Sequence, residues 1–129
     1  MTAFEEQLVE LMRSTAYLAG DTLVAGRPDP ARAAVVSTST KTSPTDIVTE
    51  RDVASEKIIV GTLLAQRPHD GIVGEEGSSL EGTSGYTWII DPLDGTINYL
   101  YGSPQWAVSI AVADAEGTLA GVEIGRAHV

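Results

Sequence analysis

The segment that constrains this chain most runs from Thr87 to Tyr99 and reads TWIIDPLDGTINY. Its apolar start, Trp88 to Ile90, consists of residues that favour a buried strand. Proline cannot donate to a sheet ladder, so we expect the strand to end at Asp91-Pro92. Gly95 permits a tight turn, and Thr96 is a good N-cap for a short helical turn. The segment is therefore predicted to deliver acids to the edge of a sheet, beside a helix start.

Two carboxylates, Asp91 and Asp94, follow this strand at a spacing of three. Carboxylates hold hard divalent cations, and the free N–H groups of a helix start hold phosphate. Asp-Pro and Asp-Gly are also common turn formers, so the same residues taken alone are more often a plain loop. The acids elsewhere in the chain must decide between these two interpretations.

The overall charge excludes several classes of partner. The 129 residues carry 18 acids against 8 Lys and Arg, a net charge of −10, which argues against nucleic acids and anionic membranes. The chain has no cysteine, which rules out disulfides, thiolate nucleophiles and zinc–sulfur sites. It has no apolar run as long as a membrane span and no signal peptide at its start, so we expect a soluble cytoplasmic protein.

The hydrophobic pattern predicts one domain with two helices and several short strands. The expected elements are a helix over about 3–25, a strand over 33–39, a loop over 41–46, a helix over about 50–66 that starts with a Thr49/Asp52 capping pair, a strand over 71–74, a mobile polar loop over 78–85, and a hairpin of strands over 107–113 and 118–124. This order predicts an α+β fold in which two helices cover one face of a mainly antiparallel sheet.

Several acids stand at the ends of these elements. Asp46 and Asp52 flank the start of the second helix, and Glu75 follows a short strand. Together with Asp91 and Asp94, Glu75 can ligate two Mg²⁺ ions about 4 Å apart, which would clamp a phosphate oxygen and lower the pKa of a bound water.

Two further groups would complete such a site. The Leu93 carbonyl, between the two aspartates, is a possible extra metal ligand. Thr96 can relay a proton from the attacking water, with Asp52 as its partner.

Each candidate also has an ordinary structural explanation. The pair Glu75-Glu76 is more often a solvated loop, Asp52 alone is more often a helix cap, and Lys41 alone is a surface lysine. His69 and His128 lack ligand spacing, and we expect both at the surface.

Three motifs together resemble the inositol monophosphatase family, in its bacterial form. They are the segment Asp46-Ile-Val-Thr49-x-x-Asp52, the glutamate motif Gly74-Glu75-Glu76-Gly77 and the segment from Trp88 to Tyr99. Order and spacing agree with the family from about residue 5 to residue 122.

The resemblance implies the N-terminal half of the layered αβαβα sugar-phosphatase fold and a lithium-sensitive, Mg²⁺-dependent phosphatase, which forms a homodimer at full length. Carried over to this chain, it implies metal binding by Glu75, Asp91, the Leu93 carbonyl and Asp94, catalysis by Glu75, Thr96 and Asp52, phosphate binding by Gly95, Thr96 and Asp94, and a loop contact from Lys41. Water would be activated by two or three metal ions.

The chain also departs from the family. Members are about twice as long, and their second half carries a Trp-Asp-x-x-Ala-Gly motif with a further metal ligand, which nothing here matches. The sequence also drifts from the family after Val122. We therefore expect residues 1–129 to be the N-terminal α+β part of such a domain, with the C-terminal half absent.

The resemblance leaves three functions open. The first is a phosphatase that acts on inositol 1-phosphate or another small phosphate monoester. The second is a catalytically inactive truncated fragment, and the third is a relative that acts on fructose 1,6-bisphosphate or 3′-phosphoadenosine 5′-phosphate.

The absent second half also gives an expectation for the hairpin. In the resembled fold a partner domain would cover its apolar residues, so in this chain we expect them to be exposed: Val108, Ile110, Val112, Leu119, Val122 and Ile124.

Overall fold

The first helix, α1 (Ala3–Ala25), confirms the amphipathic pattern at the start of the chain. The structure is a computed structural model that describes residues 1–27 and 44–125. The hydroxyl of Thr2 caps α1 by accepting a hydrogen bond from the Glu5 N–H at 3.1 Å. One side of α1 is buried, and its apolar members are Leu8, Met12, Ala16, Ala19 and Leu23.

The second long helix, α3 (Pro44–Gln66), begins at Pro44 and not at about residue 50. The expected loop over 41–46 is therefore wrong for its last residues, and the Thr49/Asp52 capping pair is wrong because both residues, like Asp46, lie inside the helix. Proline suits a first helical position, since its fixed φ matches the helix and its missing N–H would be unbonded there anyway. The expected strand over 33–39, Lys41 and His128 lie outside the described residues.

Within the described residues, five strands form one mixed sheet in the order β2-β1-β3-β4-β5. Their bounds are β1 (Gly71–Gly74), β2 (Ser79–Leu80), β3 (Thr87–Asp94), β4 (Ala107–Asp114) and β5 (Gly117–Gly125), and a short helix, α4 (Thr96–Leu100), follows β3. Only the β1–β3 pair is parallel, which confirms the expected α+β class with a mainly antiparallel sheet. The segment expected to be a polar loop, 78–85, contributes β2.

The sequence predicted that the strand would end at Asp91-Pro92. In the structure, β3 continues through Pro92 to Asp94. Its register against β4 shifts between Asp91 and Asp94. An irregular ladder tolerates proline because the missing N–H is not needed at such a point. The shifted register lies between the two candidate metal ligands of β3, Asp91 and Asp94.

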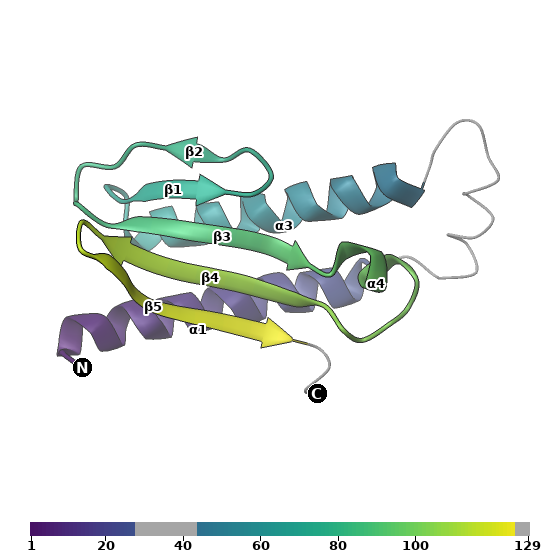
Figure 1. The fold of residues 1–129 in the computed structure, drawn as a ribbon, viewed down its shortest axis with the longest axis horizontal. Coiled ribbons are helices and arrows are strands. Elements are labelled where there is room, and N and C mark those ends of the chain that lie inside the picture. Colours follow the sequence, from purple (N-terminus) through teal and green to yellow (C-terminus); the bar gives the residue numbers. More distant parts are fainter. Residues whose placement is uncertain (28–43, 126–129) are drawn as a thin grey trace.

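The two long helices cover the same face of the sheet and lie behind it in Figure 1. Successive strand residues alternate between the faces, so Trp88, Ile110 and Val112 point to the helices and are 0% exposed. On the other face Val73 and Ile89 are 54% and 44% exposed. No helix in the described part of the chain is long and apolar enough to cross a membrane.

The expectation that the hairpin exposes its apolar residues is wrong for most of them. Val108, Ile110 and Val112 are fully buried, and Val122 and Ile124 pack against the same core. Helix α1 covers β4 and β5, and supplies the partner that we expected from another domain. Of the six residues, Leu119 is exposed, at 38%.

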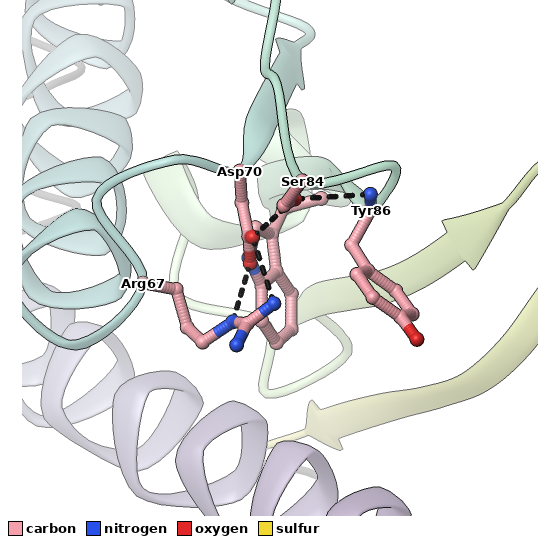
Figure 2. A network of polar contacts seen from close by, with 5 residues as sticks. Arg67, Asp70, Ser84 and Tyr86 are labelled. Atoms are coloured by element: carbon pink, nitrogen blue, oxygen red, sulfur yellow. Dashed lines mark hydrogen bonds and ion pairs between the residues drawn. The ribbon is translucent and has the colours of Figure 1, made fainter.

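A buried carboxylate, Asp70, joins the end of α3 to the sheet (Figure 2). It is 1% exposed and accepts two hydrogen bonds from the Arg67 guanidinium, each of 2.9 Å. It also accepts from the Ser84 hydroxyl at 2.6 Å and from the indole N–H of Trp88 at 2.9 Å. One side chain therefore fixes the start of β1, the start of β3 and the loop between them.

Candidate functional site

Three segments bring acids together at one edge of the sheet. Because β1 and β3 run parallel, with Gly74 opposite Ile90, both strands end at the same edge. The Glu75 N–H donates to the Ile90 carbonyl at 3.1 Å, which places Glu75 beside Asp91. The third acid, Asp52, comes from the middle of α3, where it is 7% exposed.

Asp52 lies in a strongly acidic environment. Its pKa is raised to about 7, first because the carboxyl is buried, then by the charge of Glu76 and a hydrogen bond with it, and further by Asp91 and Glu75. One oxygen of Asp52, Oδ1, is buried and has no hydrogen-bond partner among the described residues. Such an oxygen is an acceptor that a cation or a water could occupy.

The pKa of Asp91 is also raised, to about 6. Burial is the main cause, followed by a hydrogen bond with Glu75 and the charge of Glu75, with a smaller contribution from Asp94. The Leu93 N–H donates to Asp91 Oδ1 at 3.3 Å and acts in the opposite direction. The charges of Glu75 and Asp94 therefore both act on Asp91, while metal binding by these three acids stays a prediction.

The described residues contain no group of three or more His, Asp or Glu already arranged around a metal position. The ion pairs between described residues join Arg13 to Glu10 and Arg67 to Asp70, and neither involves these acids. The cluster thus combines carboxylate oxygens, one unpartnered buried oxygen and pKa values raised by burial and, to a smaller extent, by neighbouring acids. This donor set fits a hard divalent cation, which prefers oxygen ligands.

The turn after β3 differs from the expectation in its cap. Gly95, not Thr96, is the N-cap of α4, with φ of 82°, and a side chain there would approach the Gln105 carbonyl to 2.7 Å. The Thr96 hydroxyl donates to the Leu93 carbonyl at 3.1 Å, and no hydrogen bond joins Thr96 to Asp52 in the described part. A carbonyl has a second lone pair, so Leu93 remains available as a ligand.

A cavity of about 430 Å³ adjoins the acidic edge and is lined by Asp94, Gly95, Asn98, Trp106 and Glu123, among others. A larger one, of about 880 Å³, lies between α1 and α3 and contains none of the candidate residues. The smaller, polar cavity is therefore the one that matches the site.

The sequence analysis missed two buried residues of α3 at this site. The Ser55 hydroxyl donates to the Pro92 carbonyl at 2.9 Å. The Glu56 carboxylate accepts from the N–H groups of Glu76 and Ser78, each at 3.0 Å. The spacing of four between Asp52 and Glu56, which puts both acids on one helix face, was the available signal.

A third missed residue, Arg27, has no such signal in the sequence. Its guanidinium donates to the carbonyls of Tyr99, Asn98 and Ser103, which lie at or just beyond the end of α4. The Tyr99 hydroxyl in turn donates to the Leu23 carbonyl at 2.7 Å. These bonds fasten α4 to the end of α1 and so hold the segment that contains Thr96.

The raised pKa values of Asp52 and Asp91 predict how the stability of the metal-free protein depends on pH. A carboxyl whose pKa is higher in the folded state stabilises the fold while protonated, and this contribution is lost as pH rises from about 4 to about 7. We expect Asp52→Asn to raise Tm at pH 7.5 by about 3–5 °C, the effect of roughly 1 kcal/mol in a domain of this size, and not at pH 4.

The measurement is thermal unfolding followed by circular dichroism in EDTA at several pH values. The control is Asp21→Asn, which removes an exposed charge on α1. An Asp52→Asn variant less stable than the wild type at pH 7.5 would contradict the view that burial and neighbouring acids destabilise the Asp52 carboxylate.

Comparison with known proteins relates this arrangement to one family. The profile of the "Inositol monophosphatase family" matches residues 5–123. The inositol-1-monophosphatase of Rhizobium meliloti is 43% identical over 82 residues, which cover 63% of this chain and 30% of that protein. The histidinol-phosphatase of Streptomyces coelicolor is 40% identical over 101 residues, which cover 78% of this chain and 37% of that protein.

Solved structures agree in fold. The extragenic suppressor protein suhB of Bartonella henselae matches with a TM-score of 0.75 and 31% identity, over 99% of this chain and 45% of that chain. The chain thus spans less than half the length of these relatives, and corresponds to their N-terminal part.

Proposed function

Because the chain belongs to the inositol monophosphatase family, we propose that it carries the metal- and phosphate-binding part of a Mg²⁺-dependent phosphatase that hydrolyses inositol 1-phosphate. The observation that carries this proposal is the meeting of acids from α3, from the turn after β1 and from the end of β3. The family consists of phosphomonoesterases that are typically Mg²⁺-dependent.

The proposed metal ligands are Glu75, Asp91, Asp94 and the Leu93 carbonyl. In support, Glu75 and Asp94 both raise the pKa of Asp91, which is raised first by burial. When bound, Mg²⁺ would neutralise phosphate charge and acidify a water. The net charge of −10 makes such neutralisation necessary for any phosphorylated substrate.

The remaining roles fall to residues of the same edge. Gly95 and Thr96, with Asp94, would hold the phosphate at the start of α4, where Asp94 and Gly95 line the polar cavity. Glu75, Thr96 and Asp52 would orient the attacking water and take its proton. Lys41, the proposed loop contact, lies outside the described residues.

The cavity of about 430 Å³ beside Asp94 and Gly95 gives a small phosphate monoester room to bind. Relatives with other substrates exist, since one similar protein is named a histidinol-phosphatase. The sequence analysis left fructose 1,6-bisphosphate and 3′-phosphoadenosine 5′-phosphate open as alternatives, and these are the substrates to compare with inositol 1-phosphate.

The second candidate function is that of a catalytically inactive fragment which binds metal weakly. The observation that favours it is length, because the chain spans 30% to 45% of the relatives compared above. On this account residues 1–129 alone release little or no phosphate from inositol 1-phosphate, and the same residues joined to the C-terminal part of a relative release it in a Mg²⁺-dependent manner.

Thr96→Ala tests the proposed chemistry in the joined chain. We expect kcat to fall about 100-fold with KM nearly unchanged, because the hydroxyl would orient the attacking water in the transition state. The measurement is phosphate release from inositol 1-phosphate at saturating Mg²⁺. The control is Thr118→Ala, which removes an exposed hydroxyl on β5. A loss confined to KM would mean that Thr96 only binds phosphate.

A further inference from the structure

We propose that Glu56 is a positioning residue that holds the turn carrying Glu75 and Glu76 in place for metal binding. The proposal rests on the proposed function, because it assigns Glu56 a role through the metal ligand Glu75. Glu56 is 2% exposed, lies on α3 and has no part in the chemistry described above.

The turn 74–78 depends on Glu56 for two of its five backbone N–H groups. Three are satisfied by carbonyls: Gly74 N–H by Ser78, Glu75 N–H by Ile90, and Gly77 N–H by Gly74. The other two, of Glu76 and Ser78, donate to the two carboxylate oxygens of Glu56 at 3.0 Å each. Both residues are half-buried, so without this carboxylate their N–H groups would lose a partner and the turn would have to open or admit water.

Gly74 makes this contact possible. A Cβ on Gly74 would come closer to the Glu56 carboxylate than non-bonded atoms can approach. The glycine thus lets the carboxylate enter the turn, and Gly77, with φ of +101°, closes it. Both glycines of the Gly-Glu-Glu-Gly motif therefore allow the turn to form its hydrogen bonds with Glu56.

The same turn of α3 also contacts the other acid-bearing segment. Next to Glu56, the buried hydroxyl of Ser55 donates to the Pro92 carbonyl at 2.9 Å. Two adjacent residues of a rigid helix therefore hold the segments that carry Glu75 and Asp91. This fixes the separation of the two acids, which a shared cation requires.

The group that holds the turn is a carboxylate and not a neutral acceptor. Burying an ionised group costs free energy, and Glu56 forms none of the ion pairs found between described residues. Two charge-assisted hydrogen bonds to backbone N–H groups offset this cost and fix their direction. The choice of an acid beside Asp52, Glu75 and Asp91 stabilises the turn at the expense of more negative charge, which a bound cation would compensate.

The test compares Glu56→Gln with Glu50→Gln in the 129-residue chain. Gln has the same shape as Glu but accepts through one oxygen only, so one N–H of the turn would face an amide donor. Glu50 is exposed on the same helix, so its variant makes the same change in charge without touching the turn.

The first measurement is amide hydrogen exchange at Glu76 and Ser78 in the metal-free protein. We expect Glu56→Gln to speed exchange about tenfold, the equivalent of one net hydrogen bond. The second is calorimetric titration with Mg²⁺, where we expect the Kd to rise about 10- to 100-fold, as for residues that orient metal ligands. Glu50→Gln should change neither value by more than about twofold.

The two measurements distinguish the role of Glu56 in holding the turn from its role in Mg²⁺ binding. Wild-type exchange at both amides in Glu56→Gln would overturn the proposal, as would faster exchange with an unchanged Mg²⁺ affinity. A wild-type chain that does not bind Mg²⁺ would contradict the proposed function and the positioning role, while the exchange data would still decide whether Glu56 holds the turn. If Glu56→Gln does not fold, Glu56→Asp keeps the charge but withdraws it by one methylene, and wild-type values in both measurements would overturn the proposal.

Discussion

Asp91→Asn and Asp94→Asn are each expected to lower the affinity for Mg²⁺ by at least about 100-fold. An amide keeps the shape of the carboxyl group but carries no charge, and a pair of unit charges about 4 Å apart interacts by about 4 kcal/mol at an effective dielectric constant near 20. Calorimetric titration of the metal-free chain with Mg²⁺ measures the effect directly.

The raised pKa of Asp91 separates loss of metal from loss of fold. Burial and Glu75 raise the pKa of Asp91, which means that they disfavour its ionised form. Asp91→Asn should therefore leave the metal-free protein at least as stable as the wild type. The control is Glu116→Gln, which removes an exposed charge at the opposite end of the sheet. Unchanged Mg²⁺ affinity in both aspartate variants would reject the assignment of the metal ligands.

Asp70→Ala is expected to lower the free energy of unfolding by about 3–5 kcal/mol. The variant removes the acceptor for Arg67, Ser84 and the Trp88 indole (Figure 2), and the indole N–H is left without a partner in the buried core. Since a whole domain is stable by about 5–15 kcal/mol, this is a large share of the total. Urea unfolding followed by tryptophan fluorescence measures it.

The matched control is Glu10→Ala, which removes an ion pair to Arg13 at 3.4 Å in which both side chains are exposed. Exposed pairs contribute about 0–1 kcal/mol, so the control should be nearly as stable as the wild type. If Asp70→Ala lowered the free energy of unfolding no more than Glu10→Ala does, the hydrogen bonds of Asp70 would contribute little to stability.

Sequence patterns predicted those parts of the fold that depend on local chemistry. The hydrophobic pattern predicted the extent of α1, and it predicted the hairpin of β4 and β5. The three motifs identified the family and named the acids that meet at the edge of the sheet. These features can be predicted because each depends on residues a few positions apart.

Expectations failed where a local signal met a tertiary constraint. Pro92 reads as the end of a strand, yet β3 continues through it because the ladder to β4 is irregular there. Thr96 reads as an N-cap, yet Gly95 takes that place because the backbone passes close to Gln105. The hairpin's inner face is buried because α1 lies over it, a contact between segments almost a hundred residues apart.

The chemistry of the site is divided in the same way. The sequence by itself determined which acids are available, since Glu75, Asp91 and Asp94 stand in recognisable motifs. Only the tertiary structure decided their surroundings: the parallel pairing of β1 and β3 brings Glu75 to Asp91, and α3 adds Asp52 and Glu56. The physical reason is that burial, mutual repulsion and hydrogen bonding to a turn depend on distances across the fold, which no spacing along the chain records.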